Sequence, residues 1–389
     1  MGVGLGARRR DDASLDELAA LADTAGVEAA ARMLVHRARP DATFYVGSGK
    51  ADEIAARVAE LGLSLVMFDN ELSPAQQRNL ERAWKVRVAD RTDVILEIFA
   101  QRARSSEGKL QVELARLERQ SSRLVRAWTH LERQQGGAGV RGGPGEKQIE
   151  LDRRMIGVRI RQLRERLARL ERQRATRRRA RERNGSIGVS LVGYTNAGKS
   201  TLFNALTRGG TYAADQLFAT LDTLSRRLRL ADGVEVVLSD TVGFIRDLPH
   251  QLVEAFRATL EETASADLLL HVVDCASPER ESQADEVDRV LASIGAAEVP
   301  TLVVHNKVDA AGRGAGAERD AYGRIDRVFV SARTGAGLDA LREAMVEFAR
   351  AHHDRTAARP DAVDAPQAGS DPASDAAHAA PIPHDGRGA

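Results

Sequence analysis

The chain has 389 residues, of which 43% are hydrophobic and 29% charged, and its formal net charge is +1. This length predicts two or three domains. The single cysteine, Cys275, excludes a structural disulfide within the chain, and no apolar stretch is long enough to span a bilayer. The N-terminus also lacks the apolar core of a secretory signal, so we expect a cytoplasmic protein without a membrane span.

The first quarter of the chain alternates strand-like and helix-like segments. Residues 1–25 are expected to be a flexible tail, and residues 26–104 a small α/β domain with a parallel sheet. The predicted strands are 43–46, 65–69 and 86–88, and the predicted helices are 51–61, 74–84 and 93–103. Ser73 is the predicted N-cap of the second helix. The segment Gly47 to Lys50 is too short for a phosphate loop, so a tight turn is favoured there over a second nucleotide site.

Residues 105–183 combine two helical hydrophobic seams with a large positive charge. The first seam is Leu110, Leu114, Leu117, Ser121, Leu124, Trp128 and Leu131, and the second is Ile149, Arg153, Ile156, Ile160, Leu163, Leu167 and Leu170. They flank a Gly-rich loop, residues 136–145, and predict an antiparallel coiled-coil hairpin. Residues 101–183 contain 24 Lys and Arg against 10 Asp and Glu. Such charge often only solvates a helix, but an excess of arginine this one-sided favours contact with RNA.

The second half of the chain opens with a phosphate-binding pattern. Gly-x4-Gly-Lys-Ser follows the apolar run 187–192 and precedes an apolar helix pattern, so its glycines can let backbone N–H groups surround phosphates. Lys199 is predicted to reach the β- and γ-phosphates, and Ser200 to ligate Mg²⁺. The predicted nucleotide-binding residues are Gly193, Tyr194, Thr195, Asn196, Ala197, Gly198, Lys199, Ser200 and Thr201.

Two later segments predict contacts to magnesium and the γ-phosphate. Asp240 ends the apolar run 234–238 and is predicted to hold Mg²⁺ through water, while the Gly243 N–H meets the γ-phosphate. Thr220 is the predicted magnesium ligand from a mobile loop, with Thr223 as the alternative. Nucleotide contacts are predicted for Phe218, Ala219, Thr220, Leu221, Asp222, Asp240, Thr241, Val242 and Gly243. The predicted catalytic residues are Lys199, Thr220 and Gly243, and the predicted metal ligands are Ser200, Thr220 and Asp240.

The remaining loops predict a guanine pocket. An aspartate after the apolar run 301–304 can accept the N1–H and the 2-amino group of guanine, which adenine does not offer in that arrangement. Asn306 is predicted to tie this loop to the phosphate loop, and a backbone N–H after residue 330 to contact the guanine oxygen. The predicted residues are Asn306, Lys307, Val308, Asp309, Ser331, Ala332 and Arg333.

The fixed order of these patterns predicts a GTP-hydrolysing domain of Ras-like P-loop fold over residues 184–352, followed by a disordered tail at 353–389. Phe244 follows Gly243, where many GTPases carry a glutamine that orients water. Because phenylalanine cannot orient water, the isolated chain is expected to hydrolyse GTP slowly or to need a partner.

Several longer strings resemble the HflX group of ribosome-associated GTPases. They are the segments 91–103, 109–115, 142–154 and 240–249, and the resemblance extends from about residue 25 to about residue 350. It implies binding to the large ribosomal subunit and its RNA, favoured by GTP and ended by hydrolysis, in ribosome splitting, rescue or recycling. The alternative is an assembly or dormancy factor in which GTP only gates binding. We expect a monomer with Mg²⁺ as cofactor.

Overall fold

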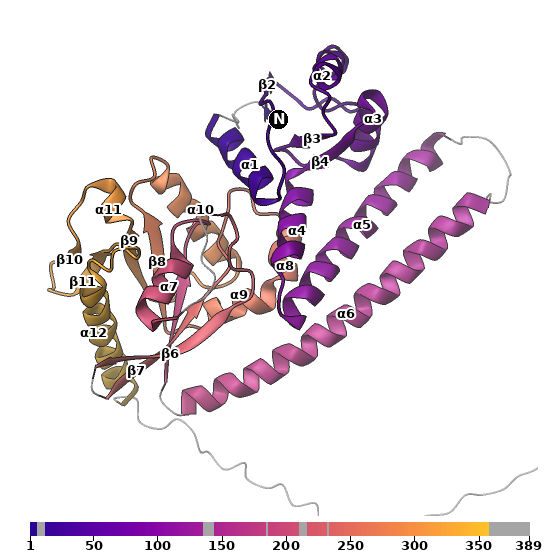
Figure 1. Ribbon diagram of the computed structural model, residues 1–389. Helices are drawn as coiled ribbons and strands as arrows, with labels where there is room; N and C mark the ends of the chain where they lie inside the picture. Colours follow the sequence, from indigo (N-terminus) through magenta and orange to yellow (C-terminus); the bar gives the residue numbers. More distant parts are fainter. Residues whose placement is uncertain (6–11, 135–143, 184–185, 210–215, 232, 358–389) are drawn as a thin grey trace, which may run out of the picture. The chain divides into compact units, whose positions relative to one another are not determined.

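The computed structural model describes residues 1–5, 12–134, 144–183, 186–209, 216–231 and 233–357 (Figure 1). Contacts divide the chain into two compact units, Met1–Glu347 and Phe348–Ala389. In the second unit the described residues form the end of helix α12 (Leu338–Ala357), where the rings of Phe348 and His352 lie 5.8 Å apart. Helix α12 therefore continues into the predicted tail, and the rest of that tail lies outside the described residues. Among the described helices, none has the length and apolar character needed to cross a membrane.

The N-terminal part contains short parallel strand pairs and helices. Strand β1 (Gly2–Leu5) pairs with β2 (Leu34–Arg37), and β3 (Leu65–Phe68) pairs with β4 (Arg87–Asp90). The helices are α1 (Asp12–Thr24), α2 (Ser48–Glu60), α3 (Pro74–Trp84) and α4 (Arg91–Arg102). The parallel α/β character predicted for this part is confirmed, as are the three predicted helices.

Two predictions for this part are wrong. The predicted flexible tail contains β1 and α1, and α1 buries Leu18 and Leu21 in a hydrophobic cluster that also contains Ile95 and Phe99 of α4. No strand forms at 43–46, because the Asp41 carboxylate accepts the N–H groups of residues 43 and 44, both at 2.8 Å, and closes a turn there. The strand lies earlier, at β2.

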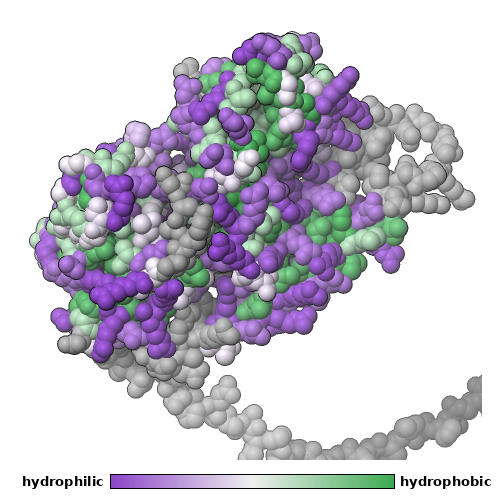
Figure 2. Space-filling model, in the orientation of Figure 1, coloured by the Kyte–Doolittle hydropathy of each residue, from purple (hydrophilic) through white to green (hydrophobic). Residues whose placement is uncertain are grey.

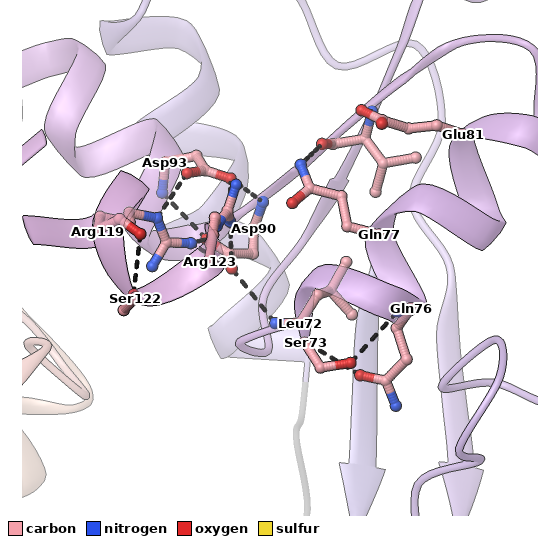
Figure 3. A network of polar contacts seen from close by, with 11 residues as sticks. Leu72, Ser73, Gln76, Gln77, Glu81, Asp90, Asp93, Arg119, Ser122 and Arg123 are labelled. Atoms are coloured by element: carbon pink, nitrogen blue, oxygen red, sulfur yellow. Dashed lines mark hydrogen bonds and ion pairs between the residues drawn. The ribbon is translucent and has the colours of Figure 1, made fainter. Parts of the chain in front are cut away.

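The predicted N-cap of α3 is confirmed and forms a capping box. The Ser73 hydroxyl accepts the Gln76 N–H at 3.2 Å, and the Ser73 N–H donates to the Gln76 side chain at 3.0 Å (Figure 3). Two otherwise unpaired backbone donors are satisfied in this way, so the helix begins at a fixed residue.

Helices α5 (Ser106–Gln134) and α6 (Pro144–Arg183) lie side by side as the two arms of a hairpin (Figure 1). Apolar residues of the two predicted seams meet between the arms: Leu110, Leu114, Leu117, Ile160, Leu163 and Leu167. Because α6 begins at Pro144, the end of the predicted loop 136–145 is helical, and proline is well tolerated in a first turn. Residues 135–143 lie outside the described part of the chain.

The hairpin surface carries both charge and some apolar area. Ion pairs join the arms at Arg159–Glu113, Arg164–Glu118 and Arg174–Glu107, each at 2.7 Å. Leu151 and Met155 of α6 are exposed apolar side chains, and hydrophobic colour appears along this arm between hydrophilic residues in Figure 2. The same view shows hydrophobic residues gathered over the N-terminal α/β part.

A buried polar network attaches α5 to the start of α4 (Figure 3). The Arg119 guanidinium donates to Asp93 Oδ1 at 2.7 Å and to Asp90 Oδ2 at 2.5 Å, and Arg123 reaches Asp93 Oδ2 at 2.9 Å. Asp90 also caps α4 by accepting the Asp93 N–H at 3.0 Å. One carboxylate therefore begins α4 and anchors the hairpin arm.

The C-terminal half contains a seven-stranded sheet with strand order β10-β11-β9-β8-β5-β7-β6. Its strands are β5 (Ile187–Val192), β6 (Leu224–Ala231), β7 (Val234–Asp240), β8 (Leu268–Asp274), β9 (Thr301–Asn306), β10 (Gly316–Arg319) and β11 (Ile325–Phe329). Strands β7, β5, β8, β9 and β11 are parallel, and the two edge strands are antiparallel. The helices are α7 (Lys199–Thr207), α8 (His250–Ala255), α9 (Arg257–Ala264), α10 (Arg280–Ser293), α11 (Val308–Ala311) and α12. The predicted fold class, a Ras-like P-loop domain after an α/β domain and a helical hairpin, is confirmed.

Candidate nucleotide-binding and catalytic site

The parallel strands deliver the predicted site residues to one edge of the sheet. Because β5, β7, β8, β9 and β11 run in the same direction, their carboxyl ends meet there, the usual place for a ligand in an open α/β sheet. A cavity at this edge is lined by Thr195, Asn196, Gly198, Lys199, Ser200, Thr201, Gln216, Phe218, Ala219, Thr220, Thr241 and Gly243. All of these except Gln216 were predicted from the sequence. Predicted residues Leu221 and Val242 lie in the core beside the cavity.

The phosphate loop connects β5 to α7 through two glycines with positive φ. Gly193 has φ 146° and Gly198 has φ 93°, which side chains rarely permit. A Cβ on Gly198 would also overlap the Asn306 side chain. Helix α7 begins at Lys199, so the loop ends at a helix N-terminus, where backbone N–H groups favour an anion.

The side chain of Lys199 lies against the backbone of the phosphate loop. Its Nζ donates to the carbonyls of Gly193 and Tyr194 at 3.0 and 2.9 Å. Burial lowers the pKa of Lys199 to about 8, although Asp240 acts in the opposite direction. A polyphosphate at this place would favour the charged form of Lys199, since an anion offsets the cost of burying a cation.

Three oxygen side chains converge beside the phosphate loop as a magnesium site requires. Thr220 Oγ1 lies 2.6 Å from Ser200 Oγ and donates to Asp240 Oδ2 at 3.1 Å. The other carboxylate oxygen of Asp240 is buried and accepts no hydrogen bond within the described part of the chain. Burial raises the pKa of Asp240. Hydroxyl and carboxylate oxygens are ligands that Mg²⁺ prefers, so this set fits the ion, and Thr220 rather than Thr223 belongs to it.

The residues after Asp240 are packed tightly against the phosphate loop. A Cβ on Gly243 would lie 2.7 Å from the Thr195 Cα and 3.0 Å from the Lys199 Nζ, so only glycine fits. Phe244 is fully buried, and its N–H donates to the Gly193 carbonyl at 3.2 Å. Its side chain therefore neither contacts the cavity nor positions water.

Asn306 connects the predicted guanine loop to the phosphate loop, as the sequence predicts. Its Nδ2 donates to the Ala197 carbonyl at 2.9 Å, and its Oδ1 accepts the Ala332 N–H at 3.0 Å. One buried side chain thereby holds three loops of the site together. Since Ala332 donates to Asn306 here, the backbone contact to the guanine oxygen after residue 330 stays a prediction.

Both charged residues of the guanine loop have a partner. Lys307 Nζ lies 2.7 Å from Asp274 Oδ2 at the end of β8, which holds the lysine stem in place. Asp309 pairs with Arg333, and the pKa of Asp309 is lowered by a hydrogen bond from Ser331 and by Arg333. Asp309 is therefore a carboxylate, the form that accepts two N–H groups of guanine.

Sequence reasoning missed a connection from the N-terminal part to this site. The Tyr194 hydroxyl donates to Glu17 of α1 and accepts the Arg246 N–H at 2.8 Å. Glu17 also pairs with Arg91, which donates to the Arg246 carbonyl at 3.0 Å. The polar network thus links α1 and α4 to the phosphate loop and to the segment after Gly243. Nothing local to Glu17 indicates this contact.

Asp222 faces away from the cavity. Its carboxylate accepts the backbone N–H groups of Arg104 and Ser105 at 2.9 and 2.8 Å, just before α5. The predicted contact between Asp222 and nucleotide stays a prediction.

A seven-stranded sheet carries, at one edge, a phosphate loop, a cluster of oxygen side chains that fits Mg²⁺ and the predicted guanine loop, an arrangement typical of P-loop GTP-binding proteins. The families described as "GTP-binding GTPase N-terminal", "GTP-binding GTPase Middle Region" and "50S ribosome-binding GTPase" match residues 12–100, 102–181 and 188–307. GTPase HflX of Escherichia coli (strain K12) is 54% identical, covering 87% of this chain and 79% of that protein. The chain belongs to the HflX family of GTPases and is a GTP-hydrolysing enzyme.

A second relative covers a similar share of the chain. GTPase HflX of Magnetococcus marinus is 53% identical, over 84% of this chain and 76% of that protein. A solved structure described as an SsGBP and GDP complex is 24% identical, with a TM-score of 0.49, covering 90% of this chain and 98% of that one.

Proposed function

We propose that this protein is a Mg²⁺-dependent GTPase that binds the large ribosomal subunit and acts in ribosome splitting, rescue or recycling. The observation that carries the proposal is the match of residues 188–307 to the family described as 50S ribosome-binding GTPase. GTP favours the bound state, and hydrolysis releases the factor.

The hairpin supports an RNA partner. Residues 101–183 carry 24 Lys and Arg against 10 Asp and Glu, and exposed arginines of α6 include Arg153, Arg154, Arg161, Arg166 and Arg169. Arginine contacts phosphates through a planar fork and stacks on unpaired bases. The apolar seam between α5 and α6 holds the arms together, so the charges are presented by a preformed element.

In the proposed mechanism each residue of the site either balances charge on the phosphates or holds a group in position. When bound, Mg²⁺ would supply positive charge to the phosphates. Ser200, Thr220 and Asp240 would hold that ion, and Lys199 would balance charge on the β- and γ-phosphates. Because Phe244 is buried, the group that orients water comes from elsewhere, and the bound subunit is our candidate.

Purified large subunits should therefore raise the steady-state rate of phosphate release by about tenfold or more, a barrier change of roughly 1.4 kcal/mol. Rates measured with and without subunits test this directly. Small subunits at the same concentration are the control. Equal rates in all three conditions would remove the large subunit from the mechanism.

Sucrose gradients test the finer statement. With a splitting factor, intact ribosomes separate into subunits when GTP or its non-hydrolysable analogue is present. If ribosomes stay intact while the protein sediments with large subunits, the assembly or dormancy alternative holds.

The guanine assignment is tested by Asp309→Asn. Loss of the charged acceptor should weaken GTP binding on the order of tenfold to a hundredfold, because charge-assisted hydrogen bonds to a base are strong. Fluorescence titration measures the dissociation constant. Xanthosine triphosphate, which replaces the 2-amino group with a carbonyl, should bind the variant better than it binds the parent. A variant with parental GTP affinity would contradict the guanine pocket.

A further inference from the structure

The first turn of α5 lies against the loop that carries Thr220. Asp222 Oδ2 accepts the N–H groups of Arg104 and Ser105, and Asp222 Oδ1 accepts the Ser105 hydroxyl at 2.5 Å. The Ser105 hydroxyl in turn accepts the Gly108 N–H at 2.8 Å. These contacts satisfy donors at the N-terminus of a helix and place a negative charge where the helix dipole favours it. The Ser105 hydroxyl thus caps the hairpin arm, and Asp222, 117 positions later in the chain, holds that cap residue in place.

Two further contacts hold the same loop to α4. The rings of Phe99 and Phe218 meet edge to face with centroids 4.8 Å apart, and both are buried. The Arg102 guanidinium donates to the side chain of Gln216. Residues 216–222, which we name the Thr220 loop, are therefore attached to the α4–α5 junction at Gln216, Phe218 and Asp222.

Thr220, in the same loop, contacts the other two residues of the proposed magnesium site. Thr220 contacts Ser200 and Asp240 in the same structure in which Asp222 bonds the residues just before α5. Asp222 follows Thr220 by two positions, and an extended chain of that length spans at most about 7 Å. While Asp222 stays bonded to Arg104 and Ser105, Thr220 must remain within this distance of Asp222. A larger withdrawal of Thr220 from Ser200 and Asp240 must break those bonds or carry the start of α5 with it.

We propose that Asp222 is a positioning residue that couples closure of the Thr220 loop over magnesium to the N-terminus of α5, and thereby to the hairpin. The inference rests on the proposed assignment of Thr220 to the magnesium shell. Coupling of this kind is reciprocal. If bound GTP stabilises the ordered start of α5, then a partner that holds the hairpin strengthens GTP binding by the same free energy.

Gly108 allows the contact to be removed without altering the loop. A Cβ at this position would overlap Asp222 Oδ1, so Gly108→Ala displaces the carboxylate. Alanine in place of glycine favours the helix itself, so loss of α5 is not the expected consequence. Gly157 of α6 has nothing within 4 Å of its Cβ position, which makes Gly157→Ala a matched control on the other arm.

Hydrogen exchange of the full-length protein tests the coupling at residues 104–109. In the parent and in Gly157→Ala, these amides should exchange about fivefold or more slowly with Mg²⁺ and a non-hydrolysable GTP analogue than with Mg²⁺ and GDP. In Gly108→Ala most of that difference should disappear. The variant should also lose about fivefold affinity for the GTP analogue, while its affinity for GDP changes less than twofold. A purely structural cap would affect both nucleotides equally.

Two results would overturn the proposal: equal exchange of residues 104–109 in both nucleotide states of the parent, or a parental difference retained in Gly108→Ala. Thr220→Ala separates this outcome from failure of the proposed function. If Thr220→Ala leaves GTP-analogue affinity and its Mg²⁺ dependence unchanged, the magnesium assignment itself is wrong. If Thr220→Ala lowers both while the parent shows no exchange difference, only the coupling through Asp222 is wrong.

Discussion

Ser200→Ala should reduce the rate of GTP hydrolysis by about a hundredfold or more, which corresponds to roughly 2.7 kcal/mol of barrier. The hydroxyl of Ser200 lies 2.6 Å from Thr220 and shares the site with Asp240, so its loss removes one of three converging oxygens. The two remaining oxygen side chains would hold Mg²⁺ less firmly, so less of the charge on the phosphates would be offset. The measurement is single-turnover hydrolysis at saturating nucleotide over a series of Mg²⁺ concentrations.

Ser190→Ala is the matched control for this prediction. Ser190 lies in β5, on the strand that leads to the phosphate loop, and its buried hydroxyl has no hydrogen-bond partner among the described residues. Removing it should leave hydrolysis near the parental rate, because an unpaired buried hydroxyl contributes nothing to folding. Parental rates in both variants would exclude Ser200 from the metal site.

Arg119→Ala should lower the free energy of unfolding by about 3–5 kcal/mol, the usual cost of leaving a buried charge without its partner. Arg119 is 6% exposed and bonds both Asp90 and Asp93, and Asp90 is fully buried (Figure 3). Without the guanidinium, Asp90 still caps α4 but its charge has lost its nearest counter-ion. Urea unfolding followed by circular dichroism measures the change.

The pH dependence of this loss identifies its cause. Burial raises the pKa of Asp90, with Asp93 acting in the same direction and Arg119 opposing it. Without Arg119 the pKa rises further, so the folded state binds a proton more readily than the unfolded state. The stability of Arg119→Ala relative to the parent should therefore improve as pH falls through that raised pKa.

Arg116→Ala provides the comparison on the same helix. Arg116 is 45% exposed and pairs with the exposed Glu97, so its loss should change the free energy of unfolding by no more than about 1 kcal/mol at any pH. A similar loss in both variants would show that the buried network does not determine the effect.

Residues that act within a short stretch of chain were predictable from the sequence alone. The phosphate loop needs glycines at Gly193 and Gly198 because the backbone there adopts positive φ, and this requirement is visible as a motif. The capping box at Ser73 and the apolar seams of α5 and α6 are equally local, since they depend on spacings of three and four residues. The order of the nucleotide motifs along the chain then predicted the sheet that would bring them together.

The tertiary structure alone decided the contacts between distant segments. The sequence of residues 12–24 gives little local indication of a helix. Helix α1 forms there because Leu18 and Leu21 pack in one hydrophobic cluster with residues of α4. At 43–46 the local sequence favours a strand, but the hydrogen bonds that Asp41 accepts stabilise a turn instead. In the sequence Asp222 is one of several loop residues, and only the tertiary structure brings its carboxylate to Arg104 and Ser105 at the start of α5. Spacing along the chain carries no information about such partners, because their energies depend on which surfaces meet after the elements have formed.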